Sequence, residues 1–401
     1  MNILFISTWF PYPQDNGARI RVYNLIKALS RHHNVSLISV LQDDSRENDI
    51  RYLSDVCDVV SCHRNHWYPS GRLVRLKGLF SLRPSFMVSS RDKRMEESVA
   101  RCIETLRPDI IVASQFVAMD YVPHRVDCPV LFEELEVGWL HGQCRNGGLL
   151  ARISWLARYY KWRYCVSDLL ARCDAYTCVS EQEKKLIAEC YQSSKMGIVL
   201  QNAIDHFHYS PNEREPIDGY MIYNGALTYG ANRDAVSYYV QEIYPIVSRL
   251  SPGVMLHVTG KLPSEGVGQI ADCPGVELTG YVDDIRFPLR RSQMCIVPLR
   301  EGGGSRIKIL EAMAAGIPVV STSVGAEGLC VENGQHLLIA DTAEDFACAI
   351  ARLRSDHSLS SMLSANARRL IEENYSWSAV GERFCNLIDS MVHKNMEQPI
   401  L

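Results

Sequence analysis

A run of three glycines that opens directly into an amphipathic segment is the feature that most constrains this chain. These residues have no β-carbon, so their backbone amides can approach an anion closely and the loop can adopt positive φ angles. Ser305 suits a helix N-cap, and we expect a helix from Arg306 onward because apolar residues then recur at helical spacing. The free amides of that helix would face the loop and favour an anion. The glycines are Gly302, Gly303 and Gly304.

Charged side chains follow this loop at positions that suit a nucleotide. Arg306 and Lys308 add positive charge at the start of the expected helix, and Glu311 lies about a turn and a half after Arg306. A carboxylate there can accept hydrogen bonds from paired sugar hydroxyls. Residues 318–322 then read as a buried strand that leads into a small-residue turn at 325–328. Because open α/β sheets bind ligands beside neighbouring strand ends, we predict a diphosphate and ribose site here, with ordinary turns as the alternative.

The order of elements along the chain indicates parallel α/β sheets. An apolar strand at 2–7, a loop, an amphipathic helix that ends at 29 and a strand at 35–40 make one βαβ unit. Short apolar runs recur in two series and predict about five strands in each of two doubly wound, Rossmann-like sheets. We expect the further strands of the first series at 110–113, 130–132 and 175–179. We expect those of the second series at 221–223, 255–258, 276–278, 294–297 and 319–320.

Length and composition predict two domains. A globular chain of 401 residues with 47% hydrophobic content is too long for one ordinary core. Asn, Asp, His and Pro accumulate at 202–216, which marks a connection. We therefore predict a first domain at 1–205, a second domain at 206–377 that holds the glycine-rich loop, and a final helix over 378–401. A central cleft between the two halves would bring the carboxyl-end loops of both sheets together.

Charge and composition also exclude several classes of protein. The net charge of −4 argues against nucleic-acid binding, and the 14 cysteines without CxxC spacing argue against zinc fingers and disulfide frameworks. No segment has the features of a signal peptide or the roughly 18 apolar residues of a spanning helix, so we expect a cytoplasmic protein. Residues 71–86 and 157–165 mix cations with aromatic and aliphatic side chains, which is typical of helices on an anionic membrane surface and also of ordinary solvated helices.

Several segments together resemble one enzyme family. The run EAMAAGIPVVSTSVGAEG resembles the donor-binding signature of glycosyltransferase family 4, and DAYTCVSEQEKKLI, LQNAIDHFHYSP and GVELTGYVDD resemble other segments of that family in the same order. The resemblance implies a GT-B fold, a nucleotide-diphosphate sugar donor and a saccharide or lipid-linked acceptor. It also implies retention of anomeric configuration without a metal or other cofactor, a final helix that packs back on the first domain, and a role in surface polysaccharide assembly.

Two departures from the family pattern concern the donor. Many members carry a Glu-x7-Glu pair, and the position eight residues before Glu311 is Gly303 in this chain. Members often place an arginine and a lysine after the first strand of the second domain, where this chain has Gly225 followed by Ala226. The missing charge would then come from two cations that also stabilise the leaving diphosphate, Arg306 and Lys308. The expected donor-binding residues are Gly17, Gly225, Gly302, Gly303, Gly304, Ser305, Arg306, Lys308 and Glu311.

The first domain offers two candidate contributions to the reaction. Glu133, Glu134 and Glu136 follow a buried strand. Either Glu134 or Glu136 orients the acceptor hydroxyl as a catalytic group, or all three carboxylates lie on a solvated loop. Gly17 gives the loop before the first helix the freedom to contact the phosphates or the acceptor; alternatively, Asn16 simply caps that helix.

Two other functions share this architecture. A sugar-nucleotide epimerase would need acid and base residues around the donor sugar, and the sequence singles out none. A non-catalytic, two-lobed binding protein would share the α/β halves but would not need Arg306, Lys308 and Glu311 together.

Overall fold

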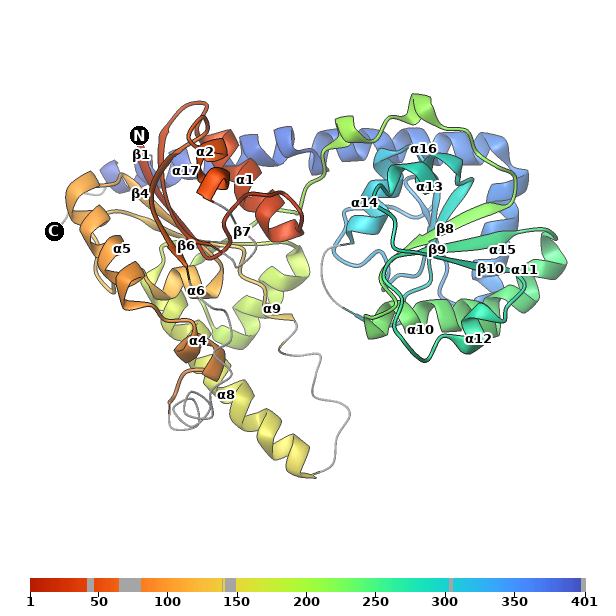
Figure 1. The fold of residues 1–401 in the computed structure, drawn as a ribbon, viewed down its shortest axis with the longest axis horizontal. Helices are drawn as coiled ribbons and strands as arrows, with labels where there is room; N and C mark the ends of the chain where they lie inside the picture. The colour runs from red at the N-terminus through yellow and green to blue at the C-terminus, as the bar shows by residue number, and fades with distance from the viewer. Residues whose placement is uncertain (42–46, 65–80, 139, 141–148, 303–305, 398–401) are drawn as a thin grey trace. The chain divides into compact units, whose positions relative to one another are not determined.

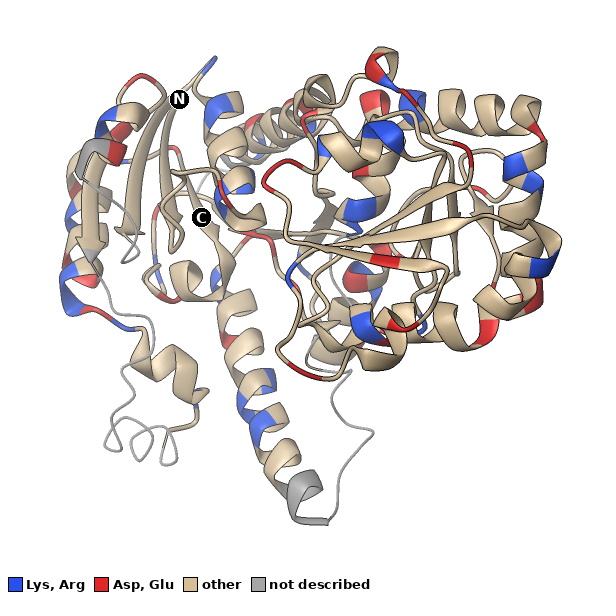
Figure 2. Ribbon diagram, turned by 45° about the vertical axis from the view of Figure 1, so that its right-hand side comes forward, with Lys and Arg blue, Asp and Glu red and all other residues tan. Residues whose placement is uncertain are grey.

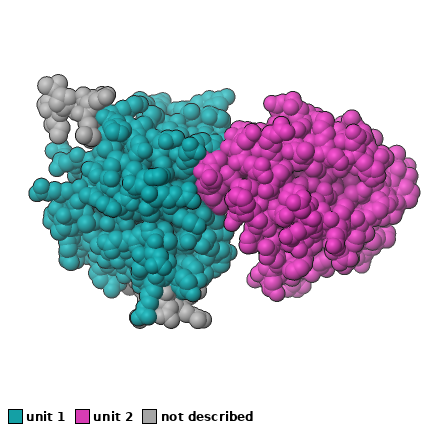
Figure 3. Space-filling view, turned by 90° about the horizontal axis from the view of Figure 1, so that it is seen from above, with its two compact units in different colours: residues 1–201, 380–401 teal, residues 202–379 magenta. Residues whose placement is uncertain are grey.

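The computed structural model contains two parallel sheets, one in each of two compact units. It describes residues 1–41, 47–64, 81–138, 140, 149–302 and 306–397 (Figure 1). Unit 1 comprises residues 1–201 with 380–401, and unit 2 comprises residues 202–379 (Figure 3). Each unit has its own buried apolar core.

Unit 1 is built on a seven-stranded sheet in the order β3-β2-β1-β4-β5-β6-β7, with every pairing parallel. Its central strands are almost continuous apolar runs, as expected for a sheet covered on both faces. The strands are β1 (Asn2–Ser7), β2 (Asn34–Leu41), β3 (Asp58–Arg64), β4 (Ile110–Ser114), β5 (Val130–Glu133), β6 (Ala175–Cys178) and β7 (Met196–Val199). The described helices are α1 (Gly17–Leu29), α2 (Glu47–Leu53), α4 (Ser85–Ser89), α5 (Lys93–Leu106), α6 (Gln115–Asp120), α8 (Leu149–Arg172) and α9 (Glu181–Tyr191).

Unit 2 repeats this plan with a six-stranded parallel sheet in the order β10-β9-β8-β11-β12-β13. Helices cover both of its faces, with α13, α14 and α16 on one and α10, α11 and α12 on the other (Figure 1). The strands are β8 (Tyr220–Asn224), β9 (Met255–Thr259), β10 (Val276–Gly280), β11 (Met294–Val297), β12 (Val319–Ser321) and β13 (Leu338–Ile339). The described helices are α10 (Gly230–Tyr238), α11 (Tyr244–Leu250), α12 (Gly268–Ala271), α13 (Arg286–Arg291), α14 (Ile307–Ala314), α15 (Ala343–Ser355), α16 (His357–Leu370) and α17 (Trp377–Glu397).

The two doubly wound sheets confirm the predicted fold class. The sequence predicted the inner strands of both sheets and the edge strand β10, but missed β3, β7 and β13, which lie at the other sheet edges. An edge strand has a neighbour on one side only, so it need not be a continuous apolar run. β7 has the apolar sequence MGIV, but it is only four residues long and none of its residues is fully buried.

The last helix, α17, begins in unit 2 and belongs to unit 1 from Val380 onward. It packs closely on α1, because a β-carbon added at Gly381 would lie 2.8 Å from the Cβ of Ala28. His33 Nε2 and Asp389 Oδ1 lie 3.3 Å apart beside this contact. The carboxyl-terminal segment therefore contributes to the packing of the first unit.

Candidate functional site

The glycine-rich loop of unit 2 leads into α14, as the sequence predicted, but the helix starts one residue late. Gly302 has a φ of 111°, so the expected positive φ is confirmed there. Arg306, and not Ser305, occupies the N-cap position, because its ψ of 46° is not helical. Gly303, Gly304 and Ser305 lie outside the described residues.

Arg306 is largely buried and lies close to Gly302 and Glu327. Its side chain is only 7% exposed, and Nη2 donates to the carbonyl of Gly302 at 2.9 Å and lies 3.5 Å from a carboxylate oxygen of Glu327. Burial lowers its pKa, while Glu327 opposes that shift. Among the residues that the structure describes, its buried Nε–H has no hydrogen-bond partner. A buried donor in this state is costly unless a ligand oxygen accepts from it, so the geometry suits an anion.

Lys308 projects from the first turn of α14 toward β8. Its Nζ donates to the Tyr223 hydroxyl at 2.9 Å and to Asn232 Oδ1 at 2.8 Å, and it lies 4.2 Å from the Tyr223 ring centroid. Burial lowers the pKa of the lysine to about 8. Gly225 makes this approach possible, because a β-carbon there would lie 2.9 Å from Nζ. A desolvated ammonium of this kind gains energy when an anion binds beside it.

Glu311 lies further along α14 and already has two partners. The Tyr209 hydroxyl donates to Oε1 at 3.0 Å, and Asn224 Nδ2 donates to Oε2. Burial raises the pKa of Glu311, whereas these two hydrogen bonds lower it. Asn224 Oδ1 is buried and has no hydrogen-bond partner within the described part of the chain. The carboxylate is therefore fixed at the carboxyl end of β8, beside Lys308.

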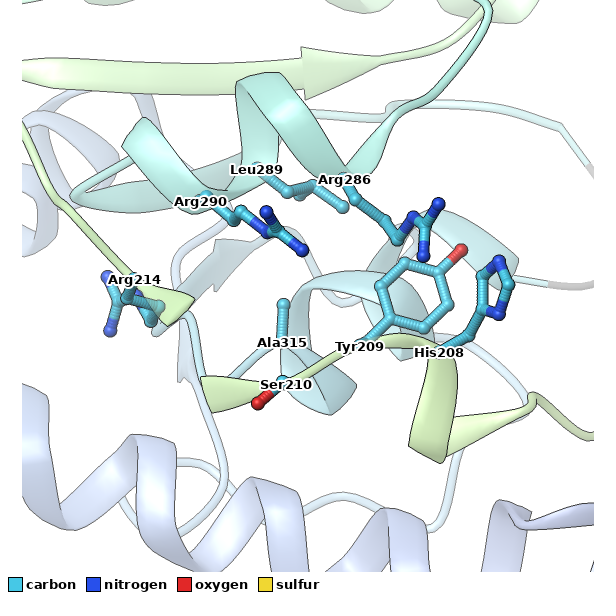
Figure 4. A pocket seen from close by; sticks show the side chains of 8 residues that line it. All are labelled: His208, Tyr209, Ser210, Arg214, Arg286, Leu289, Arg290 and Ala315. Carbon is cyan, nitrogen blue, oxygen red and sulfur yellow. The ribbon is translucent and has the colours of Figure 1, made fainter. Parts of the chain in front are cut away.

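A small hollow lies on the other side of Tyr209 (Figure 4). It is rich in cations, but Arg286 pairs with Asp284 at 2.6 Å and Arg290 pairs with Glu213. Arg286 and Arg290 are therefore paired with carboxylates, whereas Arg214 donates to the backbone carbonyls of Gly316 and Ser292. Tyr209 forms part of the wall of the hollow, and its hydroxyl donates a hydrogen bond to Glu311. The lining residues are His208, Tyr209, Ser210, Arg214, Arg286, Leu289, Arg290 and Ala315.

Unit 1 contains a buried charge cluster at the carboxyl ends of β4 and β5. Glu133 is the last residue of β5 and is fully buried. Arg21 Nε donates to its Oε1 at 2.7 Å, and the Ser114 hydroxyl donates to its Oε2 at 2.7 Å. Arg21 also donates to the carbonyls of Leu200 and Gln201. The alternative that all three glutamates lie on a solvated loop is therefore wrong, because Glu133 is fully buried and the side chain of Glu134 is only 12% exposed.

Glu134 and Gln115 form a strained pair directly after these strands. Their φ values are 58° and 72°, which side-chain-bearing residues rarely adopt. Gln115 Nε2 donates to Glu134 Oε2 at 2.8 Å, and Arg21 Nε lies 3.6 Å from Glu134 Oε1. Burial raises the pKa of Glu134 to about 7, with Arg21 opposing. Strain of this kind clusters at functional sites, and a carboxyl that titrates near neutral pH suits acid–base chemistry.

Glu136 and Gly17 have more ordinary surroundings. Burial raises the pKa of Glu136, and the nearby charge of Glu183 adds to that effect. Gly17 is the first residue of α1, and Asn16 Oδ1 accepts a hydrogen bond from Arg19 N at 3.1 Å. Asn16 therefore caps α1, and contact of Gly17 with the phosphates or the acceptor stays a prediction.

Two family models match the sequence in succession. The model described as "Glycosyltransferase Family 4" matches residues 15–206, and that described as "Glycosyl transferases group 1" matches residues 219–356. The chain is a glycosyltransferase. It is 24% identical over 393 residues to the "Uncharacterized 44.6 kDa protein in cps region" of Klebsiella pneumoniae, which covers 93% of this chain and 96% of that protein.

Solved structures show that this glycosyltransferase has the GT-B fold. Sucrose-phosphate synthase from Thermosynechococcus elongatus matches with a TM-score of 0.70 and 18% identity, over 98% of this chain and 100% of that one. Anabaena Alr3699/HepE, in its complex with UDP-glucose, matches with a TM-score of 0.62 and 14% identity, over 97% and 100% of the two chains.

Several residues of both sites were not expected from the sequence. In unit 2 they are the partners of Lys308 and Glu311, and in unit 1 they are the partners of Glu133 and Glu134. Arg21 had a readable signal, since it lies four and eight residues before Leu25 and Leu29 on the buried face of α1. Ser114, Gln115 and Asn224 lie at strand ends, whereas Tyr209 and Asn232 lie outside the strands and had no local signal. The residues that the sequence did not single out are Tyr209, Tyr223, Asn224, Asn232, Arg21, Ser114 and Gln115.

Proposed function

We propose that this glycosyltransferase transfers a sugar from a nucleotide-diphosphate sugar to a saccharide or lipid-linked acceptor, with retention of anomeric configuration and without a metal ion. The observation that carries the proposal is that Lys308 and Glu311 project from α14 beside the end of β8, directly after Arg306 at the N-cap of the same helix. The two cations suit a diphosphate, and the carboxylate suits ribose hydroxyls. The UDP-glucose complex of the HepE neighbour supports this class of donor.

In the proposed reaction, the bond between the anomeric carbon and the diphosphate oxygen breaks and its electron pair goes to the diphosphate. Arg306 and Lys308 stabilise that charge. The acceptor oxygen forms the new bond on the same face of the sugar and loses its proton to a base. We assign this role to Glu134, because Gln115 fixes its carboxyl group and its pKa of about 7 allows it to accept a proton near neutral pH. Glu136 is the second candidate for this role.

The most direct test is turnover of a panel of UDP-, GDP- and ADP-linked sugars, with and without saccharide acceptors. A transferase releases the nucleoside diphosphate, and acceptors speed that release. An epimerase would give an altered sugar nucleotide, and a binding protein would give no product. The proposal fails if the folded protein neither binds nor turns over any member of the panel.

We also propose that the product belongs to a surface polysaccharide. The name of the Klebsiella relative places that protein in a cps region, which supports this idea. Transfer to a lipid-linked saccharide purified from the source cell would test it. Activity confined to free sugars or small metabolites would contradict it.

An anionic membrane surface is the proposed partner of α8. No described helix is long and apolar enough to cross a bilayer. The amino-terminal part of α8 extends away from the sheet of unit 1 and carries several cations (Figures 1 and 2). Leu156, Tyr160 and Tyr164 are 45%, 61% and 54% exposed and lie four residues apart, so they form one stripe. Apolar side chains beside cations are typical of interfacial helices.

The second basic segment, 71–86, gives less support. Residues 71–80 lie outside the described residues. Arg83 pairs with Asp120 and Asp168 within unit 1, so it does not contribute an open cation. Sedimentation with phosphatidylglycerol vesicles should therefore depend on α8, and a Tyr160→Ser/Tyr164→Ser variant should lose binding. Equal binding of the variant, or of neutral phosphatidylcholine vesicles, would contradict the proposal.

A further inference from the structure

The segment that carries Tyr209 is fixed to unit 2 on both sides of that residue. Arg368 Nη1 donates to the carbonyls of His206 at 3.0 Å and Tyr209 at 2.8 Å. Arg214 Nη1 donates to the carbonyl of Gly316 at 2.6 Å. Hydrogen bonds from arginine to backbone carbonyls are among the stronger ones because the donor is charged. The Tyr209 hydroxyl therefore approaches Glu311 from a backbone with little freedom to move.

Glu311 retains acceptor capacity after its contacts within the protein are counted. An ionised carboxylate offers about four lone-pair positions, two on each oxygen. Tyr209 occupies one position on Oε1 and Asn224 occupies one on Oε2. One lone-pair position remains on each oxygen, so the carboxylate can accept one hydrogen bond from each of two neighbouring ribose hydroxyls. A carboxylate without these two anchors would be free to rotate about its terminal torsion and would lose this match.

We propose that Tyr209 and Asn224 hold Glu311 as a fixed acceptor of two vicinal hydroxyls and so make the donor site selective for ribonucleotides over deoxyribonucleotides. The inference rests on the proposed function, because it takes the pocket beside α14 as the donor site. Tyr209 is a positioning residue here, since its hydroxyl acts through Glu311 and not on the nucleotide.

The test compares the equilibrium binding of UDP with that of 2′-deoxy-UDP. The same comparison is made for GDP and ADP, because Glu311 would contact the ribose and not the base. A hydrogen bond to a charged group changes affinity by about tenfold to hundredfold. We therefore expect the unmodified enzyme to prefer UDP by at least about tenfold. Tyr209→Phe should reduce this preference to about threefold or less and should leave the affinity for 2′-deoxy-UDP nearly unchanged.

Two further variants keep the result interpretable. Tyr239→Phe removes the hydroxyl of another buried tyrosine of unit 2, one for which the described residues provide no hydrogen-bond partner, and should leave both affinities unchanged. Glu311→Ala should abolish the preference. If Tyr209→Phe weakens both nucleotides equally, or neither, while Glu311→Ala abolishes the preference, the role of Tyr209 is refuted and the donor site stands. If Glu311→Ala retains the preference, the ribose role of Glu311 fails and the inference fails with it.

Discussion

Replacing Lys308 by methionine should stabilise the unliganded protein and remove much of its affinity for the donor. Burial lowers the pKa of Lys308 from 10.5 to about 8. At about 1.4 kcal/mol for each pH unit, the folded state carries a cost of about 3 kcal/mol for keeping this ammonium charged at pH 7. Methionine has a similar length and carries no charge, so the substitution removes that cost.

The substitution also removes favourable contacts, which reduces the expected gain. Lys308 donates two hydrogen bonds and lies over the Tyr223 ring. No buried donor is left unpaired, however, because the Tyr223 hydroxyl donates to Asn232 Oδ1 at 2.7 Å. After these losses we expect the free energy of unfolding to rise by about 1–2 kcal/mol at pH 7. The affinity for a nucleoside diphosphate should fall by about a hundredfold, because a charge-assisted contact to phosphate is lost.

Urea denaturation and calorimetric binding of UDP, GDP and ADP would measure both effects. Because the folded-state pKa is lowered, the stability cost of Lys308 is present below pH 8 and disappears as pH rises from about 8 to 10.5. The stability gain of the variant should therefore shrink over that range, and the diphosphate affinity of the unmodified enzyme should weaken above pH 8. Lys185→Met, at a site that is 77% exposed, is the control and should change neither quantity. A Lys308→Met variant that is less stable than the unmodified protein, or binds diphosphate equally well, would refute this reasoning.

Three other substitutions test the surroundings of the two sites. Gly225→Ala would place a β-carbon 2.9 Å from Lys308 Nζ and should weaken diphosphate binding by at least about tenfold, whereas Gly230→Ala, where nothing lies within 4 Å, should bind normally. Because the pKa of Glu134 is raised to about 7, kcat/KM should increase with pH and level off above 7, and Glu134→Gln should be slower by about a hundredfold and lack this rise. Arg21→Met leaves the buried carboxylate of Glu133 without its arginine partner, so the free energy of unfolding measured by urea denaturation should fall by about 3–5 kcal/mol. A decrease below about 1 kcal/mol would contradict a buried ion pair between Arg21 and Glu133.

The inner strands were predictable from the sequence, whereas three of the four edge strands were missed. Inner strands such as β1 and β11 are apolar along almost their whole length, because helices cover both faces of the sheet. Edge strands such as β3 contain polar residues and offer no such run. Continuous apolar runs therefore identified the inner strands of each sheet, but they did not show how many strands each sheet contains.

The candidate site was predictable within one segment and not across segments. Lys308 and Glu311 were identified because loop, helix and strand follow one another within one short run. Their partners Asn232 and Tyr209 lie 76 and 102 residues away in the sequence, and no local pattern connects them. Only the parallel order of the strands brings these side chains to one edge of the sheet.

The contrast between Glu133 and Glu134 gives the acceptor-side assignment a sharper test. Arg21 Nε lies 2.7 Å from Glu133 Oε1 but 3.6 Å from Glu134 Oε1. The electrostatic attraction of Arg21 is therefore stronger for Glu133 than for Glu134. The charge of Glu133 also helps to raise the pKa of Glu134. Glu133→Gln removes that repulsion and leaves Arg21 free to attract Glu134, so the pKa of Glu134 should fall.

The rise of kcat/KM should then begin at lower pH in Glu133→Gln, with a similar plateau. Glutamine keeps the shape of the side chain and an oxygen that can accept from Arg21, which limits any loss of stability. Gln182→Glu, on the neighbouring helix α9, is a control for a change of one charge elsewhere in unit 1 and should leave the profile in place. If the profile of Glu133→Gln does not move, the group that titrates in catalysis is not Glu134, and the role of acceptor base passes to Glu136 or to a group outside this cluster.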